Sequence, residues 1–296
     1  MDQTNAMKRG YLHDNFRYFH LKDSNKENFN YHYHEFSKIV ILISGEVSYL
    51  IEGKLYQLLP WDILFVNHHD VHKPIVHSKK PYERIVIWIN PNYLTTGALH
   101  PYHLNQCFDL LQTRQSNLLR IQPKKRINLV SLLNELEASL MSLEFAHELF
   151  TNTLFLQWMV MLNRLCLAET TVDTSESVQT NKVIDALIAY INQNIAGDLK
   201  LETIANELYL SPSYLMHQFK DATGSTLHTY ITRKRLSNAL QLLRDGTAVT
   251  VAASMSGYSD YSTFLRTFRK YYHCTPTEYL NGKVTMFPSS GKALIE

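Results

Sequence analysis

Two helix-turn-helix patterns occupy the last third of the chain and constrain its fold more than any other feature. They run from Leu201 to Gly224 and from Val249 to Leu280, and a helical segment over residues 230–243 separates them. In each pattern a helix with one apolar face is followed by a turn and a second helix. A rod of roughly 14 residues is about 21 Å long, so it can space two such helices near the ~34 Å repeat of DNA. The pattern predicts two helices in neighbouring major grooves.

The second helix of the first pattern has a clear start. Ser211 offers a hydroxyl as its N-cap, and Pro212 fits the first helical position, where a missing N–H costs nothing. Leu215 and Phe219 then recur at a spacing that anchors one face to the core. The remaining residues face outward near the helix N-terminus, which in such motifs reaches phosphates and base edges. The residues expected to contact DNA here are Ser211, Ser213, Tyr214, His217 and Lys220.

The second pattern repeats this plan. Gly257 lies near the turn, where a positive φ angle is needed, and either Ser259 or Asp260 can cap the next helix. Phe264 and Phe268 anchor that helix to the core. The residues expected to contact the groove and the DNA backbone are Asp260, Tyr261, Ser262, Thr263, Arg266, Arg269 and Lys270.

A plain helical bundle without a DNA role is the alternative interpretation of one such pattern. The formal net charge is only +2, so no global basic field indicates nucleic acid, and the prediction depends on local pattern. Two patterns in order favour DNA binding, as does a set of cations on their helices: Arg233, Lys234, Arg235, Arg266, Arg269 and Lys270.

Residues from about 183 to 280 resemble the DNA-binding domain of AraC/XylS-type transcriptional regulators. The matching pieces are A-x4-LSPSYL-x3-FK-x3-G, the helix Y-I-x-x-x-R-L-x-x-A-x-x-L-L, and GYSDYSTFLRTFRKYY followed by TPTEYL. His217 stands where the family often has Arg, which weakens the guanine contact expected there. The resemblance implies that these residues lie at the DNA: Ser213, Tyr214, His217, Asp260, Tyr261, Thr263 and Arg266.

Length and composition set broad bounds. The 296 residues suffice for two domains with their own cores. Three dispersed cysteines form no C-x-x-C, which indicates neither a zinc site nor a disulfide framework and fits a reducing compartment. The polar N-terminus has no secretory signal pattern, and no run approaches the ~18 apolar residues of a membrane span. We therefore expect a cytoplasmic protein without membrane contact.

The N-terminal third predicts short β-strands separated by turns. Apolar runs cover residues 37–43, 47–52, 55–56, 62–66 and 84–90, and Gly45 and Gly53 mark turns between them. This spacing favours a small cupin-like barrel. Residues 30–90 also resemble the sensor half of AraC-type proteins, through YHYHEF and LLPWDILFVNHHDVHKP. Trp61 replaces a Gly frequent at that turn, so an atypical turn is expected.

Three histidines in this region raise the question of a metal. His32 and His34 point to one face of a strand, and His72 can join them from another strand. A metal-dependent cupin enzyme would add a carboxylate soon after the second His, but Glu35 points to the opposite face. We therefore expect no metal, no cofactor and no catalysis. A small-molecule effector pocket is one interpretation of five residues in this region: His32, His34, Tyr49, His72 and Trp88. The alternatives are that the histidines brace the barrel mouth and that the aromatic residues fill its core.

The middle of the chain predicts helices over residues 104–119, 127–143 and 145–167. The last is apolar on most faces, so it needs partners, either within the monomer or across a dimer interface. The polar segment 169–181 lacks periodicity and is interpreted as a linker. The predicted organisation is α+β with two domains: an effector-binding barrel over 1–100, dimerisation helices over 101–168, the linker 169–181, a double helix-turn-helix domain over 182–282 and a tail over 283–296.

These observations predict a sequence-specific, DNA-binding transcriptional regulator that responds to an effector, with activation as the family's commoner mode. Its expected partners are double-stranded promoter DNA, a small-molecule effector, RNA polymerase and a second copy of the chain. The alternative is a cupin-type metal enzyme or small-molecule-binding protein whose helical domain is structural.

Overall fold

The computed structural model describes residues 12, 14–23, 29–77, 80–90, 93–95, 97–168 and 174–280. The chain divides into two compact units, Met1–Gln179 and Thr180–Glu296. The first is built on two β-sheets with helices, and the described part of the second consists of helices. The predicted α+β class with two domains is therefore confirmed. The predicted tail, 283–296, lies outside the described residues.

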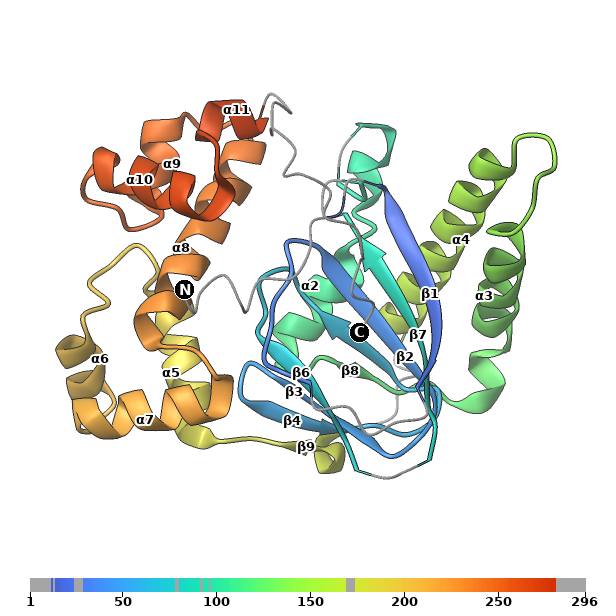
Figure 1. Ribbon diagram of the computed structural model, residues 1–296, viewed down its shortest axis with the longest axis horizontal. Coiled ribbons are helices and arrows are strands. Elements are labelled where there is room, and N and C mark those ends of the chain that lie inside the picture. Colours follow the sequence, from blue (N-terminus) through green and yellow to red (C-terminus); the bar gives the residue numbers. More distant parts are fainter. Residues whose placement is uncertain are drawn as a thin grey trace. The chain divides into compact units, whose positions relative to one another are not determined.

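The N-terminal unit contains two antiparallel sheets (Figure 1). The first has five strands in the order β1 (Phe16–Asp23), β7 (Tyr82–Ile89), β2 (Ser37–Ser44), β5 (Ile63–Val66) and β8 (Leu118–Leu119). The second has four strands in the order β6 (His72–Val76), β3 (Val47–Ile51), β4 (Lys54–Gln57) and β9 (Val178–Gln179). Strands β8 and β9 come from beyond residue 100 and complete the edges of the barrel.

Side chains on opposite faces of the five-stranded sheet enter two different cores. On β2, Val40 and Leu42 join the core shared with the four-stranded sheet, whereas Ile39 and Ile41 face the helices. Both faces are covered, so the strand is apolar along most of its length rather than alternating. The inner core is the space in which the predicted effector residues lie.

Helices α2 (Gln106–Thr113), α3 (Ile127–Ser139) and α4 (His147–Leu167) cover the outer face of the five-stranded sheet (Figure 1). Short 3-10 helices at Gly97–Tyr102 and Pro123–Lys125 precede α2 and α3, and another at Ser175–Ser177 precedes β9. Trp158 and Leu162 of α4 are fully buried there. The predicted helix 104–119 is too long, because Gln115 has a φ of 53° and the chain turns into β8, whose Leu118 and Leu119 pair with β5.

The C-terminal unit consists of α5 (Lys182–Gln193), α6 (Leu201–Glu207), α7 (Pro212–Thr223), α8 (Leu227–Arg244), α9 (Val249–Met255), α10 (Tyr261–Tyr272) and α11 (Pro276–Leu280). Two cores lie within it. Tyr230 and Ile231 at the start of α8 belong to the core of α5–α7, and Leu236 and Leu240 belong to the core of α9–α11. The single helix α8 thus links the two helix-turn-helix motifs, as predicted. Among the described residues, no helix is long and apolar enough to cross a bilayer.

Candidate DNA-binding helices and a buried histidine cluster

Helix α7, the second helix of the first motif, is built as the sequence predicts. The Ser211 hydroxyl accepts a hydrogen bond from the Tyr214 N–H at 3.3 Å, and Pro212 is the first helical residue. Leu215 and Phe219 are fully buried and attach the helix to its core. The predicted contact residues are all exposed: Ser211, Ser213, Tyr214, His217 and Lys220.

Helix α10 of the second motif begins at a strong cap. Asp260, rather than Ser259, accepts from the backbone N–H groups of Ser262 and Thr263, at 3.3 and 2.7 Å, and from the Thr263 hydroxyl at 2.7 Å. The Thr263 hydroxyl and the two N–H groups favour the ionised carboxylate and lower the pKa of Asp260. The cap therefore exposes a helix N-terminus at a defined position.

The outer face of α10 is basic. Phe264 and Phe268 are fully buried. The predicted contact residues are exposed: Asp260, Tyr261, Ser262, Thr263, Arg266, Arg269 and Lys270. Residues 261–272 contain two Arg, one Lys and no Asp or Glu, whereas residues 212–223 of α7 contain one Lys, Lys220, and one Asp, Asp221. Electrostatic attraction to phosphate is therefore stronger at α10 than at α7.

The residues predicted to line an effector pocket come together inside the barrel. All five are at most 9% exposed: His32, His34, Tyr49, His72 and Trp88. The ring centroids of His32 and His72 are 4.3 Å apart, those of His34 and His72 are 4.9 Å apart, and those of His32 and His34 are 5.0 Å apart. The backbones of His32 and His72 exchange hydrogen bonds of 3.1 and 2.9 Å. Tyr49 also enters this core.

Backbone carbonyls orient two of these imidazoles. Nδ1 of His32 lies 2.8 Å from the Asn30 carbonyl oxygen, and Nδ1 of His72 lies 2.9 Å from that of Asp70. A carbonyl only accepts, so each Nδ1 carries a proton, and the neutral form of such a ring keeps its lone pair on Nε2. Burial, reinforced by the charge on His32 and then on Lys38, holds the pKa of His72 well below its usual value. His72 is therefore neutral at physiological pH.

Three histidine nitrogens, one from each ring, lie within 4.8 Å of one another. The sequence led us to expect no metal at these residues, yet the fold gathers them in ligand-like proximity. Glu35 is not part of the group, because its carboxylate lies 3.5 Å from Nε2 of His69. The arrangement therefore offers three imidazole nitrogens as ligands without a carboxylate.

Sequence reasoning missed two buried cations in the same barrel. Lys38 on β2 and Arg84 on β7 are each 2% exposed. Arg84 forms an ion pair with Asp23 and lies over the Tyr82 ring at 4.0 Å, and the Tyr82 hydroxyl donates to that of Tyr49 at 3.4 Å. The available signal was their position in the strands, because each cation lies two residues from an apolar residue that faces the inner core, Val40 for Lys38 and Val86 for Arg84.

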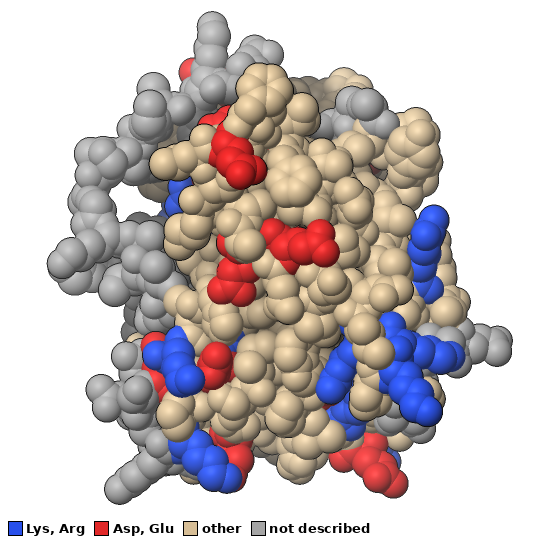
Figure 2. Space-filling model, turned by 90° about the vertical axis from the view of Figure 1, so that its right-hand side faces the viewer, with Lys and Arg blue, Asp and Glu red and all other residues tan. Residues whose placement is uncertain are grey.

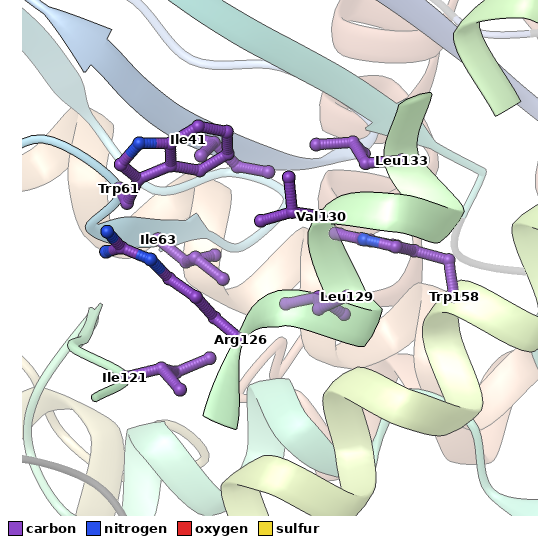
Figure 3. Close-up of a pocket in the computed structure, with 9 residues that line it drawn as sticks. All are labelled: Ile41, Trp61, Ile63, Ile121, Arg126, Leu129, Val130, Leu133 and Trp158. Carbon is purple, nitrogen blue, oxygen red and sulfur yellow. The ribbon is translucent and has the colours of Figure 1, made fainter. Parts of the chain in front are cut away.

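A separate pocket lies between the five-stranded sheet and helices α3 and α4 (Figure 3). Its walls are largely apolar, and the Arg126 guanidinium lies 5.4 Å from the centroid of the Trp61 ring at one side. Trp61 has a φ of 71°, in the left-handed region that glycine favours, although Trp stands where a Gly is frequent. Among the described residues, the buried Nε1 of Trp158 has no hydrogen-bond partner. The lining residues are Ile41, Trp61, Ile63, Ile121, Arg126, Leu129, Val130, Leu133 and Trp158.

Comparison with protein families matches both units. Residues 17–159 match the AraC-like ligand binding domain, and residues 204–282 match a helix-turn-helix domain. A ligand-binding barrel on the same chain as a double helix-turn-helix unit defines a DNA-binding transcriptional regulator. The chain belongs to the AraC family of these regulators.

Two curated relatives align with most of this chain, and a solved structure aligns with about a third of it. The HTH-type transcriptional activator RhaR of Mannheimia succiniciproducens is 25% identical over 253 residues, which cover 85% of this chain and 87% of that protein. The activator RhaS of Escherichia coli O6:H1 is 26% identical over 257 residues, with the same coverage. A solved DNA-binding transcriptional dual regulator of Escherichia coli K-12 is 35% identical, covering 35% of this chain and 93% of its own, with a TM-score of 0.32.

Proposed function

We propose that this regulator activates transcription in response to a small effector held in its barrel. The observation that carries its DNA contacts is the pair of capped helices, α7 and α10, whose outer faces are exposed while their inner faces anchor to separate cores. Its relatives RhaR and RhaS are named as activators, which supports the direction of regulation and RNA polymerase as a partner. Because promoter DNA is its target, we place it in the cytoplasm and assign it no catalytic role.

The residue roles differ between the two helices. The basic face of α10 supplies phosphate contacts and a base contact through Arg266, since Arg side chains pair with guanine edges. The α7 face supplies Tyr214 and His217 for shape and polar contacts. Asp260 acts by fixing the N-terminus of α10, because its carboxylate already accepts three hydrogen bonds there.

The test is selection of genomic DNA fragments by the purified full-length protein at near-physiological salt, followed by sequencing. We expect a motif with two parts about one helical turn apart, since two recognition helices enter successive major grooves. The genes beside the enriched fragments then indicate the effector. Failure to enrich any motif, with and without cell extract as a source of effector, would contradict the proposed promoter recognition.

We further propose that two copies of the chain associate through the turn between α3 and α4. This turn and the start of α4 expose large apolar side chains: Leu140, Met141, Leu143, Phe145, Leu149 and Phe150. Phe145 is 100% exposed and Leu143 is 95% exposed. Figure 2 shows the face formed by these two helices, on which uncharged surface predominates around a small group of carboxylates. Contiguous apolar surface of this kind marks an interaction site.

A Leu143→Ser/Phe145→Ser variant should weaken the dimer. Burying each of these side chains is worth about 1.5–3 kcal/mol, so losing both raises the dimer Kd by about a hundredfold or more. Sedimentation velocity over a concentration series measures this. Leu59→Ser is the control, because Leu59 is an exposed leucine (54%) in the barrel, away from this turn. Equal dissociation of both variants, or of neither, would remove this turn from the interface.

A further inference from the structure

We propose that His32, His34 and His72 bind one divalent transition-metal ion inside the barrel, with a coordination position left for an exogenous ligand. The inference deepens the effector site proposed above by naming the chemistry of its occupant. It depends on the N-terminal unit alone, and its binding test does not require DNA.

The geometry is close to that of a three-histidine site. The ligand nitrogens lie within 4.8 Å of one another, and the three residues are 2%, 5% and 0% exposed. A tetrahedral ion with bonds of about 2.0–2.1 Å holds its ligands roughly 3.3 Å apart, so the rings must close by at most about 1.5 Å. His32 and His34 lie outside the long strands, in a segment that pairs with β6 through the single bridge between His32 and His72.

The contacts of Nδ1 support metal binding more specifically than proximity does. Metal-bound histidines usually donate their second ring N–H to a carbonyl or carboxylate, which orients the ring and fixes its tautomer. Both His32 and His72 do this, to the carbonyls of Asn30 and Asp70. In the neutral form of each ring the lone pair is therefore on Nε2, and Nε2 of His72 is buried with no hydrogen-bond partner among the described residues.

A metal ion suits this group better than a proton does. A proton can bind to only one of these ring nitrogens, and it leaves a positive charge buried. A divalent ion accepts from all three rings at once. Imidazole ligands suit zinc, copper, iron and nickel, and three of them leave a fourth position open.

The nearby charge indicates what the fourth ligand is. The His72 imidazole is neutral, and the buried Lys38 is close enough for its charge to act on it. A divalent ion therefore adds positive charge to a site that already contains the charge of Lys38. An anion on the open position, such as a carboxylate, offsets both charges and would be the class of effector that this site selects.

The experiment is a Co²⁺ titration of the full-length, tag-free protein after dialysis against a chelator. Bound tetrahedral Co²⁺ absorbs visible light, so the spectrum reports both stoichiometry and geometry. We expect one ion per chain, and a loss of affinity of about a hundredfold or more in His34→Ala and in His72→Ala, since even outer-shell changes cost 10–100-fold. Acetate should then alter the spectrum of the wild-type complex by entering the open position.

Two variants act as controls. His228→Ala removes an exposed histidine on α8 and should bind Co²⁺ as the wild type does. Lys38→Met disturbs the same buried interior without removing a ligand, and should bind Co²⁺ at least as tightly because a like charge is gone. The proposal is overturned if the wild type binds no Co²⁺, if the histidine variants keep wild-type affinity, or if Lys38→Met loses the ion as they do. DNA selection by the same metal-free preparation reports separately on the regulator function.

Discussion

Replacing Gly257 with alanine should cost the C-terminal unit about 2–5 kcal/mol of stability and remove most of its DNA binding. Gly257 has a φ of 84°, which costs an L-residue about 1–2 kcal/mol. A Cβ there would also lie 2.5 Å from the Ile195 carbonyl oxygen and 2.7 Å from Nε of Arg235. The oxygen belongs to the backbone and cannot move freely, so overpacking adds about 1–3 kcal/mol.

The effect on DNA follows from where Gly257 lies. It is in the turn of the second motif, and the groups that it contacts belong to α8 and to the loop that precedes the first motif. Arg235 donates from Nε to the Ile195 carbonyl at 3.0 Å and from Nη2 to the Gly197 carbonyl at 2.7 Å. Displacing that guanidinium breaks the bonds that hold the two motifs in one orientation, and recognition helices need a fixed separation to occupy successive grooves.

Gly246→Ala is the matched control. Gly246 has nearly the same φ, 85°, but an added Cβ there meets nothing within 4 Å. It should therefore show only the backbone cost of about 1–2 kcal/mol and retain DNA affinity once folded. Chemical denaturation and DNA titration of both variants measure the difference. Equal losses in the two would mean that the close approach at Gly257 contributes nothing to stability.

The helix-turn-helix motifs could be predicted because their signals are local. Caps such as Ser211 and anchors such as Phe264 lie within a few residues of the elements they define. The long strands β2 and β7 are also local apolar runs. By contrast, β8 and β9 have only two residues each and exist because β5 and β4 offer them an edge. Strand β6 was not predicted because it contains Pro74, and proline is depleted in strands.

The histidine site was only half predictable. The i and i+2 spacing of His32 and His34 placed them on one face, and the antiparallel partner that brings His72 to them is a tertiary feature. The position of the buried Lys38 beside the histidines is also a tertiary feature, which sequence spacing alone could not predict. The exposure of the α3–α4 turn could not be predicted from the local sequence either. The helices also carry apolar residues on the side that packs against the sheet, so an apolar residue alone does not indicate exposure.

Arg266→Ala should lower specific DNA affinity about 5- to 140-fold, which corresponds to about 1–3 kcal/mol for a base contact. Arg266 is exposed on α10, and its Nη2 donates to the Thr263 hydroxyl at 3.2 Å. That hydroxyl in turn donates to the capping carboxylate of Asp260. The guanidinium is thus held in position before DNA arrives, which reduces the entropy lost on binding. Titration against operator variants should show relaxed preference at one base position.

Lys270→Ala separates base recognition from phosphate contact on the same helix. Lys270 is exposed one turn further along α10, where the helix leaves the groove. A phosphate contact carries no sequence information, so its loss should weaken all operator variants alike and reduce the slope of log affinity against log salt by about one unit. Measured at several salt concentrations, the two variants should therefore differ in kind: Arg266→Ala changes which sequence is preferred, and Lys270→Ala changes how steeply salt weakens binding. A base-selective effect of Lys270→Ala, or an unchanged sequence preference in Arg266→Ala, would contradict these roles. It would mean that α10 presents a different face to the groove.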